Sequence, residues 1–267
     1  MTNPSKIYWF TEKELPYSSN SIRISTKINS VLFDQKSDFC RIQVFDTPFY
    51  RRMLVMDGIV QTTEIDEFIY HEMMVIAPSL YHGNIKRALV IGGGDGGSIR
   101  QAVRIKSLQK VTMVEIDQVV IEASKAHIPT VSGGAFSNKK VEVIVGDGKK
   151  YLEKSKEKFD LIVLDLTDPF PDSPAVNLFM EPFLHTVKKS LAAGGILAMQ
   201  CGSLLFQPEE VSTITKRLRR IFSLVRSHNA VVPGYQLSSF GFLYACDGPL
   251  HEPVCQIMMQ SLEICSF

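Results

Sequence analysis

The sequence predicts an α/β protein, in which a doubly wound, mostly parallel seven-stranded sheet follows a small antiparallel β domain. From Lys86 onward, short apolar runs alternate with stretches of helical periodicity, which is typical of a parallel sheet covered by helices. Residues 88–91 form an unbroken apolar run that suits a strand buried on both faces. Residues 1–63 instead alternate polar and apolar side chains, as half-buried antiparallel strands do.

Residues 1–64 are expected to form the small N-terminal β domain, with about six strands. The alternation is clearest in residues 21–29 and recurs in parts of 40–45 and 53–60. Asp57-Gly58 is a typical turn dipeptide between two such strands.

A connecting helix is predicted over residues 65–80, within a segment that ends at residue 82. Six apolar residues recur there at helical spacing and share one face. They are Ile65, Phe68, Ile69, Met73, Ile76 and Leu80. Tyr70 and His71 fall off that face, so they are either incidental surface residues or residues that face a cleft between two domains.

Residues 83–267 are expected to form a Rossmann-like domain. The predicted strands are 87–91, 111–115, 141–145, 160–164 and 194–200, followed by two closing strands, 223–232 and 240–246, that could be antiparallel. The predicted helices are 98–106, 118–127, 148–155, 176–191 and 208–221. The sequence gives no placement for the tail, residues 248–267.

Composition narrows the class of protein further. The chain has 267 residues and a net charge of +1, so nothing in its balance of charges favours nucleic acid as a partner. Its five cysteines are dispersed and form no C-x-x-C pair, which fits reduced thiols in the cytoplasm. We expect no membrane segment, because no apolar run approaches the ~20 residues needed to span a bilayer.

The loop Gly92-Gly-Gly-Asp-Gly-Gly97 follows the first strand of the predicted sheet. Such a turn lets the backbone approach a ligand closely, and it exposes the N–H groups at the start of the next helix. The loop matches the nucleotide pattern G-x-G-x-x-G only loosely, so alone it is equally consistent with a plain glycine turn. Glu115 favours the nucleotide interpretation, because it ends the next strand, where an acidic residue can accept hydrogen bonds from ribose hydroxyls.

Acidic residues follow the carboxyl ends of four predicted strands. They are Asp95, Glu115, Asp147, Asp165 and Asp168. One such residue is commonly a helix N-cap, and Asp147 alone is explained in that way. Five of them at one sheet edge predict a strongly negative cleft in a nearly neutral protein, which suits a cationic substrate.

Asp165 and Asp168 form the most informative pair. Pro169 pushes Asp168 into an extended conformation, so the turn could present both carboxylates to one ligand. Two close carboxylates raise the pKa of one member, which becomes a better proton acceptor. The alternative is a structural turn that the two aspartate side chains stabilise.

Six stretches, in this order along the chain, carry a resemblance to a known family. They are Leu54–Gln61, Asp66–Met73, Gly92–Gly97, Val114–Asp117, Gly146–Gly148 and Asp165–Pro169. In them the chain resembles the polyamine aminopropyltransferases, the spermidine synthase family, which has a methyltransferase-type sheet. Three features look closer to the thermospermine synthase branch: Asp165-Leu-Thr-Asp-Pro169, Ala135–Lys140 and Val232–Tyr235.

This resemblance implies that an aminopropyl group moves from decarboxylated S-adenosylmethionine to an amine and that methylthioadenosine is released. The donor is a co-substrate; neither a cofactor nor a metal is implied. The implied donor-binding residues are Gln61, His71, Asp95, Glu115, Asp147 and Gly148. The implied acceptor-binding residues are Tyr70, Asp165, Asp168 and Tyr235, with Asp165 as the general base and Pro174 in a gate loop. The family also implies a homodimer or homotetramer.

Several positions depart from the family pattern. Cys40 stands where a donor-contacting glutamine is usual, and Gln43, three residues on, is expected to point to the opposite face. The acceptor loop Pro233-Gly-Tyr-Gln-Leu-Ser238 keeps the tyrosine but not its usual neighbours. The gate segment 169–174 is one residue longer than usual, and the tail is unrelated.

The leading hypothesis is therefore an aminopropyltransferase that uses putrescine as the acceptor and forms spermidine. Spermidine as the acceptor, giving thermospermine or spermine, is the main alternative. A methyltransferase of the same topology is disfavoured by Asp95 and by the Asp165/Asp168 pair. A non-catalytic nucleoside- or polyamine-binding homologue is favoured by Cys40 and the altered acceptor loop, but it would not need all of the carboxylates.

Overall fold

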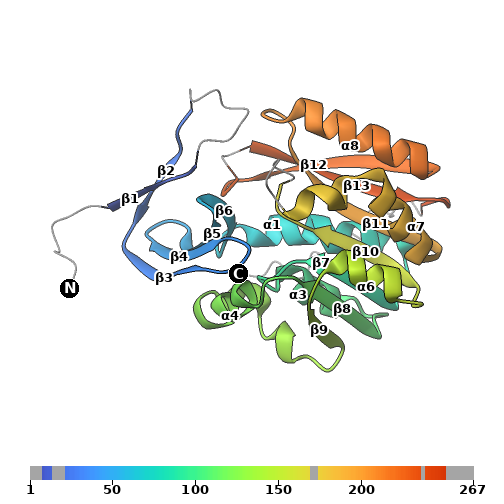
Figure 1. The fold of residues 1–267 in the computed structure, drawn as a ribbon, viewed down its shortest axis with the longest axis horizontal. Helices are drawn as coiled ribbons and strands as arrows, with labels where there is room; N and C mark the ends of the chain where they lie inside the picture. Colours follow the sequence, from blue (N-terminus) through green and yellow to red (C-terminus); the bar gives the residue numbers. More distant parts are fainter. Residues whose placement is uncertain (1–7, 14–21, 169–173, 236–237, 251–267) are drawn as a thin grey trace.

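The computed structural model describes residues 8–13, 22–168, 174–235 and 238–250, and a seven-stranded sheet forms its centre (Figure 1). Its strands are β7 (Arg87–Gly92), β8 (Lys110–Glu115), β9 (Val141–Val145), β10 (Phe159–Asp165), β11 (Leu191–Ser203), β12 (Leu224–Val232) and β13 (Ser238–Cys246). The strand order is β12-β13-β11-β10-β7-β8-β9. The five strands β7 to β11 run parallel, whereas β13 is antiparallel to both β11 and β12. The predicted fold class and the two antiparallel closing strands are confirmed.

Six described strands precede this sheet, as predicted, and lie on its left in Figure 1. β1 (Tyr8–Thr11) and β2 (Ser25–Ile28) form a two-stranded ribbon. β3 (Ser30–Lys36), β4 (Arg41–Thr47), β5 (Arg51–Met56) and β6 (Ile59–Thr63) form a four-stranded antiparallel sheet. One face of this sheet packs its apolar residues against the helices that follow β8, so the N-terminal strands lie over one side of the central domain.

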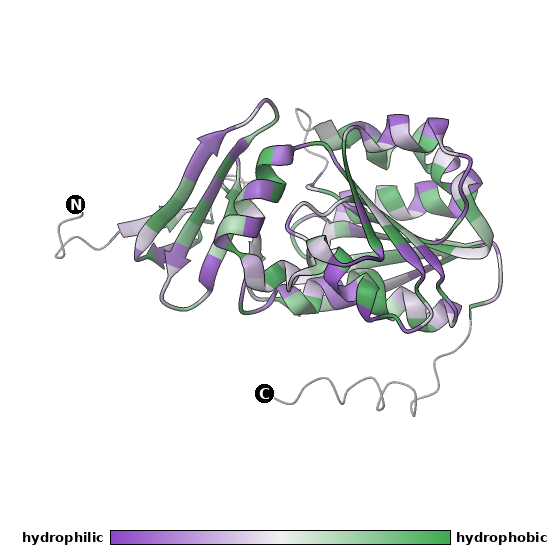
Figure 2. Cartoon of the chain, turned by 90° about the horizontal axis from the view of Figure 1, so that it is seen from below, coloured by the Kyte–Doolittle hydropathy of each residue, from purple (hydrophilic) through white to green (hydrophobic). Residues whose placement is uncertain are grey.

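Helices cover both faces of the central sheet. They are α3 (Gly97–Arg104), α4 (Gln118–His127), α5 (Pro129–Ser132), the 3₁₀ turn η2 (Ala135–Ser137), α6 (Gly148–Lys154), the 3₁₀ turn η3 (Pro174–Phe179), α7 (Glu181–Ser190) and α8 (Pro208–Ile221). Figure 2 shows hydrophobic residues along the central strands and hydrophilic residues alternating with them on the outer helices. Among the described residues, no helix is both long and apolar enough to cross a membrane.

The prediction of one helix over 176–191 is wrong. The structure has the 3₁₀ turn η3 and then α7, separated at Met180, whose backbone is extended with a ψ of 149°. Pro182 lies in the first turn of α7, where a missing N–H costs nothing because that group has no helical partner. This proline marks the start of α7 in the sequence.

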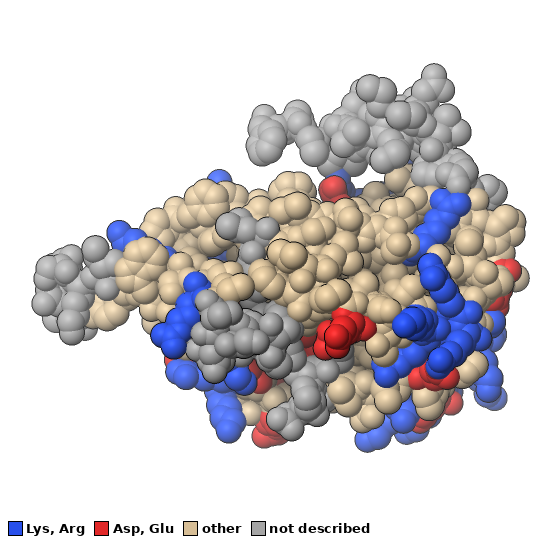
Figure 3. All heavy atoms as spheres, turned by 90° about the horizontal axis from the view of Figure 1, so that it is seen from above, with Lys and Arg blue, Asp and Glu red and all other residues tan. Residues whose placement is uncertain are grey.

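Basic side chains lie on the outer surface. In the view of Figure 3, Lys and Arg gather at the end of the molecule opposite the N-terminal strands, and few acidic side chains are visible among them. Of the acidic residues that follow the central strands, Glu115 is only 9% exposed, and the other four are partly buried. The chain, whose net charge is near zero, thus has a basic patch at this end of the molecule and a group of acidic side chains at the carboxyl ends of the central strands.

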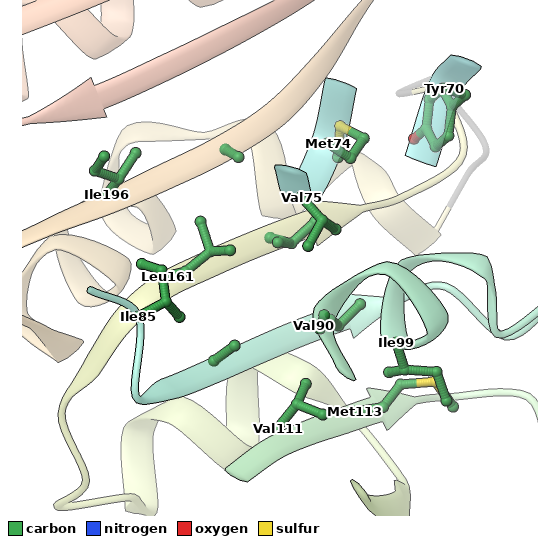
Figure 4. Packing of buried hydrophobic residues seen from close by; sticks show 14 of the residues in the cluster. Tyr70, Met74, Val75, Ile85, Val90, Ile99, Val111, Met113, Leu161 and Ile196 are labelled. Carbon is green, nitrogen blue, oxygen red and sulfur yellow. The ribbon is translucent and has the colours of Figure 1, made fainter. Parts of the chain in front are cut away.

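The connecting segment also differs from its prediction. It consists of α1 (Glu67–His71), a π-helical turn η1 (Glu72–Ile76) and α2 (Ala77–His82). The predicted apolar face is only partly the buried one. Ile65 and Phe68 are exposed, and the fully buried residues Tyr70, Met74 and Val75 lie outside the predicted face. Two other members of the predicted face, Ile69 and Met73, are partly buried against the core. Figure 4 shows the side chains of Tyr70, Met74 and Val75 near the central strands. The cause is tertiary packing, since both stripes are apolar and the sheet selects the one that contains Tyr70.

Candidate active site

A cavity of about 860 Å³ opens at the carboxyl ends of the parallel strands, beneath β5 and β6 of the N-terminal sheet. Nine of the residues predicted for the site line it. They are Gln61, Tyr70, Asp95, Glu115, Asp147, Gly148, Asp165, Asp168 and Tyr235. The structure thus brings the predicted donor and acceptor residues to one shared space, at the sheet edge where doubly wound folds bind ligands.

The glycine loop after β7 brings two parts of this site together. Gly92, Gly93 and Gly96 have φ values of 83°, 70° and 83°, a region that favours glycine. A Cβ on Gly92 would lie 2.0 Å from the carbonyl oxygen of Asp165, and one on Gly97 would lie 2.2 Å from His71. Only glycine allows the loop to pack this closely against both residues.

Asp95 is held in a chain of buried charges. Its Oδ1 accepts a hydrogen bond from the backbone N–H of Gly97 at 2.9 Å, and its Oδ2 lies 3.3 Å from Nε2 of His71. On the other side of the ring, Nδ1 of His71 lies 2.7 Å from Glu67, which also pairs with Arg100 at 2.8 Å. The chain orients the Asp95 carboxylate into the cavity.

The contacts among His71, Asp95 and Glu67 determine the pKa values of His71 and Asp95. Burial alone would lower the pKa of His71, but Asp95 and Glu67 outweigh burial and raise this pKa well above its ordinary value. Burial would likewise raise the pKa of Asp95, yet the His71 imidazolium holds it below its usual value. His71 is therefore a buried cation and Asp95 an anion at neutral pH.

The sequence placed His71 among the residues that line the donor pocket, and the structure puts it behind Asp95, with 1% of its surface exposed. His71, Asp95 and Asp165 also have ligand atoms within 4.8 Å of one another, a spacing that could hold a metal ion. In this structure both ring nitrogens of His71 already face carboxylates, Nδ1 that of Glu67 at 2.7 Å and Nε2 that of Asp95 at 3.3 Å.

Asp165 ends β10 and accepts two side-chain hydrogen bonds. The hydroxyl of Tyr70 donates to Oδ1 at 2.8 Å, and the hydroxyl of Ser98 donates to Oδ2 at 2.6 Å. Burial raises the pKa of Asp165, the charge of His71 opposes that shift, and the charge of Asp95 adds to it. A fixed, buried carboxylate with a raised pKa has the properties of a general base.

Asp168 lies three residues further on and is held by two amides. Nε2 of Gln200 donates to its Oδ1 at 3.0 Å, and Nε2 of Gln207 donates to its Oδ2 at 3.3 Å. Burial raises the pKa of Asp168, and both amides lower it. These donors are neutral, so the negative charge of Asp168 is oriented but not neutralised.

Glu115 and Asp147 complete the acidic lining on the other side. Glu115 accepts the backbone N–H of Asp117 at 3.0 Å, and burial raises its pKa to about 7. Asp147 caps α6 by accepting the backbone N–H of Lys149 at 2.8 Å, as the simpler interpretation of its position predicted. It also lines the cavity, so the capping role and a binding role are compatible.

Aromatic rings form the remaining wall. The rings of Tyr70 and Tyr235 meet edge to face with centroids 5.6 Å apart, and Phe240 contacts both. The hydroxyl of Tyr235 donates to the backbone carbonyl of Gln61 at 2.6 Å. This wall suits the methylene groups of a ligand whose charged ends meet the carboxylates.

Two other predictions concern the edges of the site. Cys40 lines the cavity, and burial raises the pKa of its thiol to about 12, so it is a neutral thiol there. Gln43 bonds to Asp34 at 3.0 Å and is not among the lining residues, in agreement with the expected opposite face. Pro174 begins η3, but its side chain and residues 169–173 lie outside the described residues, as does most of the tail.

Four residues of the site were missed from the sequence: Glu67, Ser98, Gln200 and Gln207. Gln200 could have been predicted from the sequence, because it lies near the carboxyl end of β11, at the same sheet edge as the carboxylates. Glu67 could have been predicted as well, since it precedes His71 by four residues on α1. Ser98 and Gln207 could not, because their partners Asp165 and Asp168 lie 67 and 39 residues away.

Comparison with known proteins gives the same picture over nearly the whole chain. Residues 67–251 match the spermine/spermidine synthase domain, and residues 8–64 match the spermidine synthase tetramerisation domain. Polyamine aminopropyltransferase from Bacillus cereus is 40% identical over 246 residues, which cover 92% of this chain and 86% of that protein. The Thermoanaerobacter sp. enzyme of the same name is 37% identical over 234 residues, 88% of this chain and 82% of its own.

Solved structures agree. Spermidine synthase in complex with the transition state analogue AdoDATO superposes with a TM-score of 0.87 at 30% identity, covering 95% of this chain and 84% of that one. Spermidine synthase from Thermotoga maritima gives a TM-score of 0.85, also at 30% identity, and covers 95% of this chain and 83% of its own. The chain belongs to the spermine/spermidine synthase family of polyamine aminopropyltransferases.

Proposed function

We propose that this protein moves the aminopropyl group of decarboxylated S-adenosylmethionine to an amine, with putrescine as the preferred acceptor and spermidine as the product. Family membership supports the reaction, and one structural observation carries it. The partly buried carboxylates of Asp95, Asp165 and Asp168 share a single cavity with the aromatic wall formed by Tyr70 and Tyr235.

The donor lies on the side of the glycine loop in this proposal. Asp95 binds the ammonium end of its aminopropyl group, Glu115 accepts from the ribose hydroxyls, and Asp147-Gly148 contacts the adenine. Gln61 lines the same space. His71 acts indirectly, because its contact with Asp95 keeps that carboxylate charged and oriented. Asp95 would also repel the carboxylate of ordinary S-adenosylmethionine, which gives a physical basis for choosing the decarboxylated donor.

The acceptor amine lies between Tyr70, Asp168 and Tyr235 and attacks the methylene carbon bound to the sulfonium sulfur. The new C–N bond forms as the C–S bond breaks, and the sulfur keeps the electron pair and leaves as neutral methylthioadenosine. The attacking nitrogen must be neutral before the step, and its proton passes to Asp165.

The free-energy cost of the reaction explains why the site contains several carboxylates. An alkylamine has a pKa of about 10.4, so deprotonating it at pH 7 costs roughly 4–5 kcal/mol. Asp165, fixed by Tyr70 and Ser98, shares that cost when the amine binds against it. An ammonium and a sulfonium ~4 Å apart also repel by about 4 kcal/mol at an effective dielectric constant of ~20, and the three carboxylates offset this repulsion. Alignment of the nitrogen and the carbon supplies much of the remaining rate.

The deciding experiment measures release of methylthioadenosine from the decarboxylated donor, with putrescine, cadaverine, agmatine and spermidine as parallel acceptors. We expect the highest kcat/KM with putrescine. A preference for spermidine would assign the longer acceptor, to which the thermospermine-like stretches point. Donor binding without turnover of any amine would mean a non-catalytic homologue.

We further propose the division into an N-terminal β domain (1–64), a connecting segment (65–82) and a catalytic domain (83–267), assembled as a homodimer or homotetramer in the cytoplasm. The match of residues 8–64 to a tetramerisation domain supports an oligomer. The mass of the protein in solution, measured by light scattering, distinguishes the two assemblies.

A further inference from the structure

The turn between β12 and β13 that carries Tyr235 is fastened to the other side of the cavity. The hydroxyl of Tyr50 donates to the carbonyl of Pro233 at 3.2 Å, and the hydroxyl of Tyr235 donates to the carbonyl of Gln61 at 2.6 Å. Between them, the backbone N–H of Gly234 donates to Oδ2 of Asp66 at 2.5 Å. All three partners lie far from the turn in sequence: Tyr50 is in the turn between β4 and β5, Gln61 is on β6, and Asp66 directly precedes α1.

Both carboxylate oxygens of Asp66 are used in hydrogen bonds, one of them to Gly234. The residue is 4% exposed, and its second oxygen accepts the hydroxyl of Thr63 at 2.5 Å. It occupies the N-cap position of α1, yet its side chain accepts no hydrogen bond from that helix. An aspartate at this position ordinarily stabilises its own helix by capping it. Here the carboxylate instead accepts from a residue 168 positions away, which indicates a role other than capping.

Gly234 is the other half of the contact. A Cβ at this position would lie 3.0 Å from Cγ2 of Thr63 and 3.1 and 3.3 Å from the two carboxylate oxygens of Asp66. Its backbone is not in the left-handed region, so conformation does not require a glycine. Instead, the absence of a side chain on Gly234 allows its backbone N–H to lie close to the carboxylate of Asp66.

The same helix holds the opposite wall of the acceptor side. Tyr70 lies four residues after Asp66, on α1, donates to Asp165 and meets the ring of Tyr235 at 5.6 Å. One end of α1 thus fixes the turn that carries Tyr235, and its next turn fixes the ring that Tyr235 packs against.

We propose that Asp66 is a positioning residue for the acceptor: through Gly234 it sets where Tyr235 lies relative to Tyr70 and Asp165, so the start of α1 controls acceptor affinity. This inference rests on the proposed function, because it takes the space beside Tyr235 as the acceptor side. Asp66 itself makes no printed contact with Asp95, Glu115 or Asp147, so we expect its removal to affect the acceptor more than the donor.

The first test compares Asp66→Ala with Asp66→Asn. Alanine removes both acceptor oxygens, and asparagine keeps one of them. We expect the KM for the amine to rise about tenfold or more in Asp66→Ala and less in Asp66→Asn, because a hydrogen bond to a charged group is lost. The KM for the donor should stay within about twofold in both variants.

Asp160→Asn is the matched control, since Asp160 also accepts two backbone N–H groups, those of Lys86 and Arg87, but at the opposite edge of the sheet. A merely structural loss would move both KM values or lower kcat alone. Unchanged acceptor KM in Asp66→Ala, or an equal change in the donor KM, would overturn the inference.

The second test uses Gly234→Ala. The added Cβ presses on Thr63 and Asp66, so we expect the same selective rise in acceptor KM. Adding Thr63→Ser removes the methyl group that the Cβ meets at 3.0 Å but keeps the hydroxyl, and it should recover part of the loss. Absence of any recovery, together with a donor KM that rises equally, would contradict the proposed contact.

Failure of the proposed function is distinguishable from failure of this inference. If the wild-type protein turns over no amine, the function fails, and hydrogen exchange still tests the contact. Exchange of the turn around Gly234 should be faster in Asp66→Ala than in wild type and in Asp160→Asn. Equal protection in all three proteins would show that Asp66 does not hold the turn.

Discussion

The two sides of the cavity are held in different ways. On the donor side, Asp95, Glu115 and Asp147 each accept a backbone N–H from the residue two positions later. On the acceptor side, Asp165 and Asp168 are held by side chains that lie between 32 and 95 residues away in sequence. The donor side is therefore built mainly from local turns, to which the contact of His71 with Asp95 is the long-range addition, and the acceptor side is built from the assembled fold.

This difference has a functional consequence. A carboxylate fixed by its own turn needs little from the rest of the protein, so a donor pocket of this kind can stay constant while its surroundings change. A carboxylate fixed by distant amides and hydroxyls moves when any of their elements moves. Substitutions on the acceptor side should therefore alter acceptor affinity or turnover and leave the donor in place.

The largest effect on ligand affinity is expected from Asp95→Asn, which tests the donor side. The variant loses the charge that faces the donor's ammonium and removes one partner of the His71 imidazolium. Affinity for the decarboxylated donor, measured by titration calorimetry, should fall about 10- to 150-fold, the range for a lost hydrogen bond to a charged group. Methylthioadenosine lacks the aminopropyl group, so its affinity serves as the internal control. Equal loss for both ligands would place Asp95 outside the ammonium site.

A smaller effect, on the acceptor side alone, is expected from Gln200→Ala. Asp168 loses the amide that orients its Oδ1, so the acceptor KM should rise about tenfold while donor affinity is unchanged. Gln200→Glu keeps the shape but places a second negative charge near Asp168, and it should be more damaging still. A rise in donor Kd in either variant would break the separation of the two sides.

Glu115 predicts a dependence of stability on pH. Burial raises its pKa from 4.5 to about 7 in the folded protein, so the folded state holds this proton more tightly than the unfolded state. The contribution of Glu115 to stability is therefore greatest below pH 4.5 and is lost as the pH rises to about 7, a change of at most about 3 kcal/mol. Glu115→Gln should unfold at a higher temperature than wild type at pH 8 and at a similar one near pH 4.5. A lower unfolding temperature at pH 8 would contradict this pKa.

The smallest effect is expected from Ser98→Ala. The Ser98 hydroxyl lowers the pKa of Asp165, so its removal should raise that pKa and shift the acidic limb of the rate profile to higher pH. We expect kcat at pH 8 to fall only a few-fold, because the hydrogen bond from Tyr70 remains. A shift of the acidic limb to lower pH would show that Asp165 is not the general base.

The contrast between the two sides also explains what could be predicted from the sequence. Strand ends and the turns after them are local features, so the fold class, most elements and the acidic donor-side residues could be predicted from periodicity and position. Tyr70 showed the limit of local information, because helical spacing favoured the stripe that contains Phe68, and the sheet selected the other one. Gln207 is a second example of this limit, because no residue near it in sequence indicates that it contacts Asp168, 39 residues away.

The measurement that tests the central claim most directly is single-turnover transfer by Asp165→Asn, together with calorimetric binding of the donor. We predict that the rate falls about 10²- to 10⁴-fold, the usual contribution of a positioned proton acceptor, while donor affinity stays within about twofold of wild type. Transfer at the wild-type rate, or loss of donor binding in step with the rate, would contradict the role assigned to Asp165.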